Sequence, residues 1–179
     1  MKKSLLLSFA LLLILPLGHA QGLGTTTVTN QVSVTVAAEA ALTIGASATT
    51  LTSTGTNFSD YTGTTPFTYF IRTGKTAGSG FIKLQVTTDF APSGGPSVAT
   101  PLTPGDTLSY TCTVSSPGTA CSGSQTSSTA SQMSVATFST DAHSAKVGNS
   151  ASVTWDLSND PLYQTGTFTA VVTYTISAS

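Results

Sequence analysis

The chain has 179 residues, of which 39% are hydrophobic and only 7% are charged, and its formal net charge at pH 7 is −1. Six Lys and Arg residues against seven Asp and Glu residues exclude a basic patch for nucleic acid or anionic lipid. Soluble domains usually carry about 25% charged residues, so a surface built instead from Thr, Ser and Gly is typical of a wall, matrix or filament setting.

The first twenty residues, MKKSLLLSFALLLILPLGHA, have the pattern of a secretory signal peptide. Lys2 and Lys3 precede an apolar stretch over residues 5–15, and small residues lead to a predicted cleavage between Ala20 and Gln21. The stretch is too short for a comfortable membrane span, and no later segment is long or apolar enough to be one. We therefore expect export through the Sec route to the periplasm, cell surface or exterior, with residues 21–179 forming one domain.

The segment TVTNQVSVTVAAEAALTI, residues 27–44, alternates apolar and polar residues for longer than one ordinary strand of about 3 to 10 residues requires. Its first half carries the apolar row Val28, Val32, Val34 and Val36, with Asn30 as the exception. Either the run bends around residues 37–41 and serves both sheets of its own domain, or residues 26–36 leave the domain as an extended strand that pairs with another copy. Small residues at 37, 38, 40 and 41 allow the break that both interpretations need.

Six further stretches are rich in Val, Ile, Thr and aromatic residues and predict short strands: 67–73, 81–90, 108–114, 133–138, 152–157 and 166–176. The segments 46–66, 91–106 and 115–132 between them are rich in Gly, Pro and Ser and predict loops. No segment has a helical period. The pattern predicts an all-β fold, an antiparallel immunoglobulin-like β-sandwich of about seven to eight strands, with a jelly roll as the alternative.

Two cysteines, Cys112 and Cys121, predict a structural disulfide in an exported chain. Cys112 lies in a predicted strand and Cys121 follows the turn-forming Pro117 and Gly118, so we expect the bond to close a short hairpin. The spacing is not Cys-x-x-Cys, and this argues against a redox role.

Residues suited to catalysis or metal binding are few. After the predicted signal peptide the one histidine is His143, which shares a strand face with Asp141 if the segment is extended, but no nucleophile motif accompanies the pair. Asp156, Asn159 and Asp160 offer calcium-type oxygens in WDLSNDP, although Asn-Asp-Pro is itself a turn former. We predict no catalytic residue, no cofactor and no metal.

The single tryptophan, Trp155, alternates with Val153 and Leu157, which predicts a core position. The same WDL sequence resembles the W-x-L signature of Gram-positive cell-wall-binding domains, which implies wall binding. Aromatic residues at Tyr61, Phe67, Tyr69 and Phe70 suggest a carbohydrate surface, but period two assigns Phe67 and Tyr69 to a core-facing row.

An export signal, an alternating segment directly after it, a Thr-rich sandwich and the closing strand TGTFTAVVTYTISAS together resemble bacterial pilus and biofilm-fibre subunits that assemble by donor-strand complementation. The resemblance implies self-association in which a terminal strand of one subunit fills a groove in its neighbour. The expected function is therefore a non-enzymatic structural or adhesive surface protein. The alternatives, in order, are a monomeric binding module for cell-wall polymer or glycan, and a secreted enzyme.

Overall fold

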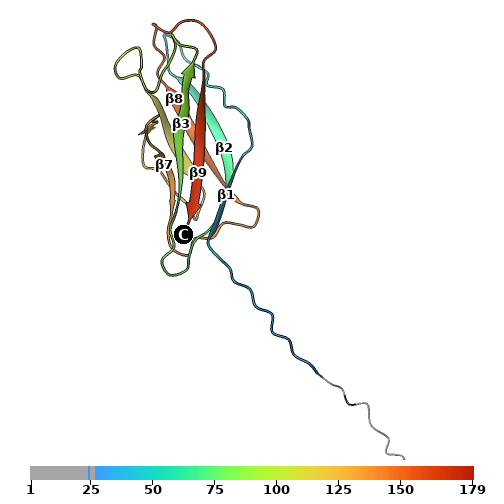
Figure 1. Ribbon diagram of the computed structural model, residues 1–179. Helices are drawn as coiled ribbons and strands as arrows, with labels where there is room; N and C mark the ends of the chain where they lie inside the picture. The colour runs from blue at the N-terminus through green and yellow to red at the C-terminus, as the bar shows by residue number, and fades with distance from the viewer. Residues whose placement is uncertain (1–23, 25–26) are drawn as a thin grey trace, which may run out of the picture. The chain divides into compact units, whose positions relative to one another are not determined.

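Two antiparallel sheets account for the regular structure of this protein in a computed structural model that describes Gly24 and residues 27–179 (Figure 1). The predicted signal peptide and its cleavage site lie outside the described residues. The strands of the described part are β1 (Glu39–Ile44), β2 (Tyr61–Arg72), β3 (Gly80–Ala91), β4 (Leu108–Val114), β5 (Thr119–Ala120), β6 (Gln125–Thr126), β7 (Met133–Phe138), β8 (Asn149–Leu157) and β9 (Thr169–Ala178).

The five-stranded sheet has the order β1-β2-β8-β4-β6 and the four-stranded sheet the order β5-β7-β3-β9, and every pairing is antiparallel. Inward side chains of both sheets meet in one core. The predicted all-β sandwich is therefore confirmed. Its nine strands exceed the predicted seven to eight because β5 and β6, of two residues each, are too short to show an alternation.

The central strands obey the predicted period of two. On β2, Phe67, Tyr69 and Ile71 are buried, and on β8 the buried side chains are Val153, Trp155 and Leu157. The strand β2 is longer than expected, since it begins at Tyr61 and includes Pro66. β1 ends opposite Phe67, so before that point β8 is the only named strand that pairs with β2. Pro66 lies in this part of β2, beside an open edge, where a residue without an N–H is tolerated.

The long alternation of residues 27–44 is divided at its middle. Residues 27–38 belong to no strand, and β1 begins at Glu39. The break therefore lies just before Glu39, and the small residues Ala40 and Ala41 are part of the strand rather than of the bend. Within the described residues, only the second half of the run belongs to a sheet.

Candidate functional site

The two long edge strands, β1 and β9, run along the same side of the sandwich (Figure 1). Within the described residues, β1 pairs with β2 alone and β9 with β3 alone, so no backbone ladder joins these two edges. Their core-facing side chains are only partly buried, namely Ala40, Leu42 and Ile44 on β1 and Ala170, Val172, Tyr174 and Ile176 on β9. By contrast, Ile82 and Leu84 of β3 are fully buried. We call this incompletely covered side the β1–β9 seam.

Tyr174 is the polar member of the seam. Its ring packs against Phe67 with centroids 5.6 Å apart, and burial raises the pKa of its phenol to about 12. Among the described residues, its hydroxyl is the one buried side-chain polar atom without a hydrogen bond of standard geometry, although the nearby Thr65 hydroxyl offsets part of the rise in its pKa. A buried polar group without a partner costs about 1 to 3 kcal/mol of folding free energy, so the Tyr174 hydroxyl is an unfavourable feature beside the seam.

The opposite side of the sandwich has short edge strands and the disulfide. Its edges are β5 and β6, and edges this short offer little backbone for further pairing. Cys112 of β4 and Cys121, directly after β5, form the predicted disulfide with 5.6 Å between their Cα atoms. The expected hairpin is wrong, however, because β4 and β5 belong to different sheets. The bond therefore connects the two sheets on the side away from the seam.

The predicted donor row does not contribute to the core. Val28, Val32 and Val34 are 86%, 88% and 84% exposed, and Val36 is 62% exposed. Thr26, the first residue of the predicted strand, lies outside the described part. Within the described residues, the rest of the segment belongs to no strand, and its apolar side chains are exposed.

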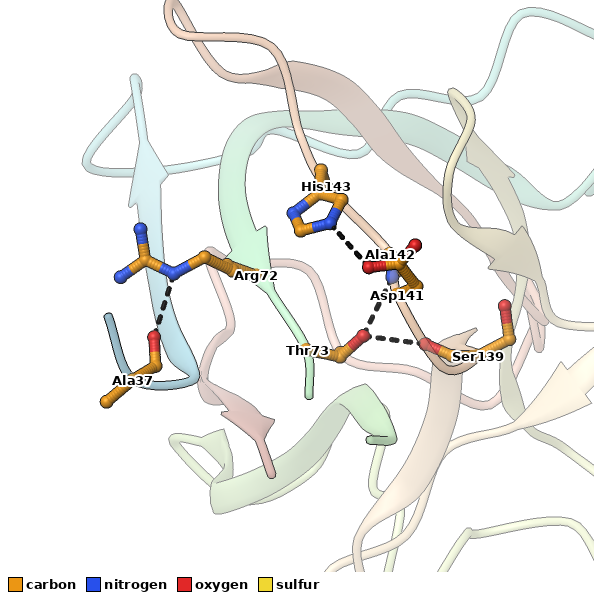
Figure 2. A network of polar contacts seen from close by, with 7 residues as sticks. All are labelled: Ala37, Arg72, Thr73, Ser139, Asp141, Ala142 and His143. Atoms are coloured by element: carbon orange, nitrogen blue, oxygen red, sulfur yellow. Dashed lines mark hydrogen bonds and ion pairs between the residues drawn. The ribbon is translucent and has the colours of Figure 1, made fainter. Parts of the chain in front are cut away.

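Arg72, the last residue of β2, holds the chain where it joins the domain (Figure 2). Its Nε donates a hydrogen bond of 2.8 Å to the carbonyl oxygen of Ala37, and its Nη2 forms an ion pair of 2.9 Å with Glu39 Oε2. The guanidinium thus contacts both the start of β1 and the residue two positions before it. This contact fixes the position from which the N-terminal segment departs.

A second network lies next to Arg72 and orders the turn between β7 and β8 (Figure 2). The Thr73 hydroxyl donates to Ser139 O over 2.8 Å and accepts from Ala142 N over 2.8 Å. His143 Nε2 and Asp141 Oδ1 are 2.9 Å apart, so the two residues do meet, although Asp141 lies in a turn and His143 in an isolated β-bridge to Arg72 rather than in a named strand. Both side chains are about half exposed, and within the described residues the ring makes no other side-chain hydrogen bond.

The carboxylates of WDLSNDP lie at the far end of β8, where they support turns. The Asp160 carboxylate accepts from Thr103 Oγ1 and from the backbone N–H of Leu162, and these bonds lower the pKa of Asp160. Asn159 donates its backbone N–H to Asp60 Oδ1 over 3.1 Å. No group of three or more His, Cys, Asp or Glu side chains in the described chain is arranged to hold a metal ion.

The aromatic candidates for wall or glycan binding are mainly core residues. Trp155 is 4% exposed, and its Nε1 donates a hydrogen bond of 2.9 Å to the Thr65 hydroxyl. Phe67 and Tyr69 are also buried, whereas Tyr61 and Phe70 are partly exposed. The core interpretation of Trp155 is confirmed, and the indole presents no surface to a wall polymer.

Two parts of this site leave no signal in the sequence. Arg72 has no motif around it, and a single arginine at the end of a strand carries no signal of what it contacts. The seam was also missed, because alternation in 166–176 predicts a core-facing row but not how completely that row is covered. The exposed Val171, which breaks the polar outer row of β9, was the one local irregularity.

Comparison of the chain with protein-family models, with curated proteins and with solved structures found no match. In the part of the chain that the structure describes, no helix has the length and apolar character that a membrane crossing needs.

Proposed function

We propose that the protein is an exported, non-enzymatic structural or adhesive surface subunit that self-associates by strand addition. Residues 26–36 of one copy complete the β1–β9 seam of another. The observation that carries the proposal is that one chain has both an apolar row outside its own sheets and a seam whose core is incompletely covered. Each part supplies what the other lacks.

Burial of the valine row provides the driving force. Val28, Val32 and Val34 are more than four-fifths exposed, and fully burying a valine side chain contributes about 1.5 to 3 kcal/mol. An added strand also satisfies the free backbone groups along an edge, which is how strand addition gains affinity. Alternate side chains of the segment then face the core, and those between them face water.

The lengths agree. β9 has ten residues, which at about 3.3 Å per residue is about 33 Å of edge, and residues 27–36 span the same length when extended. A long edge of this kind is a ready template for pairing, whereas the two-residue strands opposite are not. The disulfide that connects the sheets on the side opposite the seam is typical of proteins of the cell surface or exterior.

The test is the assembly state of the secreted protein, with a matched pair of variants. Val34→Asp places a charge in the row that enters the seam, and we expect it to abolish assembly in sedimentation and electron microscopy. Ser33→Asp adds the same charge on the opposite face of the strand and should assemble like the unaltered protein.

A second arm uses a variant that begins at Ala37. It should stay monomeric, and an added peptide of residues 25–37 should bind it and raise its melting temperature. An unaltered protein that stays monomeric at high concentration, with the amides of residues 28–36 protected inside its own domain, would contradict strand addition. If that monomer bound wall polymer or glycan, the binding-module function would replace it.

A further inference from the structure

The charged side chains of the sandwich are separated along its strands. β2 runs from Tyr61 to Arg72. We call the end of the sandwich where β2 begins the Asp60 end, and the end where β2 stops the Arg72 end. Five of the seven acidic residues lie at the Asp60 end, namely Asp60, Asp89, Asp106, Asp156 and Asp160. The loops there are tied together, since Gln164 N donates to Gly94 O and Tyr163 Oη donates to Asp106 Oδ2. No Lys or Arg of the described chain lies at this end.

The Arg72 end has the opposite character. Three of the four described Lys and Arg residues, Arg72, Lys75 and Lys146, lie there with His143, and they line two open pockets. Glu39 and Asp141 are the acidic residues of this end, and they are engaged with Arg72 and His143 respectively. Lys75 and Lys146 are exposed and have no ion-pair partner among the described residues. Their charges are therefore available to a partner.

At the Asp60 end, the Asp60 and Asp156 carboxylates repel each other. Partial burial raises the pKa of Asp89, but hydrogen bonds from Ser97 Oγ and from three backbone N–H groups outweigh it and lower the pKa. Partial burial and then the neighbouring Asp60 charge raise the pKa of Asp156. A cationic surface placed on this end would relieve the repulsion between Asp60 and Asp156.

We propose that the Arg72 end of one copy docks on the Asp60 end of the next, so that copies stack head to tail. This inference rests on the proposed function, because it concerns how the same subunits meet. Like ends placed together would repel, whereas opposite ends attract and steer the encounter. The N-terminal segment leaves the domain at Ala37, at the Arg72 end, so it reaches the neighbour's seam from the neighbour's Asp60 end. In that direction it lies antiparallel to β9, as β3 does.

The experiment compares single charge reversals that change the net charge equally. Lys75→Glu alters an exposed cation of the docking end, whereas Lys83→Glu alters a cation inside the ladder of β3 that stacks on Phe81. We expect Lys75→Glu to slow assembly about tenfold at low ionic strength, as followed by light scattering, and added salt to slow the unaltered protein. Lys83→Glu should assemble at the unaltered rate.

Charge exchange supplies the decisive arm. The doubles Lys75→Glu/Lys146→Glu and Asp60→Lys/Asp156→Lys should each slow assembly. The quadruple variant keeps the unaltered net charge and exchanges these two pairs of charges between the ends, so it should recover part of the lost rate. Tryptophan emission checks that each variant is folded. An equal effect of Lys75→Glu and Lys83→Glu, or a folded quadruple variant without recovery, would overturn the docking. Loss of assembly in Val34→Asp alongside either result would leave the proposed strand addition standing.

Discussion

Arg72 Nε donates a hydrogen bond to the carbonyl oxygen of Ala37 over 2.8 Å, although the two residues are 35 positions apart. The same guanidinium pairs with Glu39, so the end of β2 holds the residues just before and at the start of β1. The Glu39 side chain is 77% exposed, and exposed ion pairs contribute only about 0 to 1 kcal/mol. The contact therefore directs the chain more than it stabilises the domain.

Replacing Arg72 should separate these two effects. Arg72→Met keeps most of the aliphatic stem and removes every donor, so we expect a loss in unfolding free energy below about 1 kcal/mol. Amide hydrogen exchange at Glu39 and Ala40 should nevertheless become faster, because the start of β1 loses its anchor. Lys83→Met is the control. Exchange at Glu39 and Ala40 that stays as slow as in the unaltered protein would show that the ladder to β2 alone holds β1.

The disulfide should stabilise without any chemical role. Cys112 and Cys121 are nine positions apart, and the chain-entropy model assigns a loop of that size about 2.5 to 3 kcal/mol. We expect the Cys112→Ala/Cys121→Ala variant to lose about that amount in urea unfolding. Peptide mapping without reductant should recover the two cysteines linked. Two free thiols in exported protein, or an unchanged urea midpoint in the variant, would argue against this role.

Trp155 is the single tryptophan, so its fluorescence reports on the core directly. Its burial predicts a blue-shifted emission maximum, and Trp155→Ala should cost about 3 to 5 kcal/mol of unfolding free energy. Thr65→Val should cost about 1 to 3 kcal/mol, because the indole N–H then has no acceptor. Solvent-like emission from the folded protein would contradict the core position.

The effects of replacing Tyr174 and Tyr110 by phenylalanine can be compared at neutral pH. The Tyr110 hydroxyl donates to Ser134 O over 2.8 Å, whereas the Tyr174 hydroxyl is buried without a partner. Tyr110→Phe should therefore cost about 0.5 to 1.5 kcal/mol, and Tyr174→Phe should be neutral or stabilising in the monomer. Equal losses in thermal unfolding would show that Tyr174 has a partner after all.

The same two tyrosines predict how stability responds to alkali. Burial raises the pKa of Tyr110 and of Tyr174 from 10.0 to about 12 in the folded protein. Between these values the folded state binds more protons than the unfolded state, so the unfolding free energy falls as pH rises from about 10 to 12. Below pH 10 the contribution is fully present. Phenylalanine at both positions should make the fall shallower in denaturant titrations over that range.

Strand positions were largely readable from the sequence. The predicted segments 108–114 and 133–138 coincide with β4 and β7, because each is a short run of β-branched and aromatic residues between turn formers. The start of β2 was missed, since Gly63 and Pro66 disfavour a strand locally while the pairing with β8 across Thr64 and Thr154 overrides them. Local composition cannot register a partner ninety residues away.

The sequence by itself determined the all-β class, the core-facing rows of the central strands, the disulfide partners and the unusual apolar row of residues 28–36. Each follows from residue type and a period of two, which are local properties. Only the tertiary structure decided that β1 and β9 share a side, that Cys112 and Cys121 connect different sheets, and that Arg72 holds Ala37. It also decided that the charges divide between two ends. These features depend on strand order, which is set by packing between segments far apart in the chain.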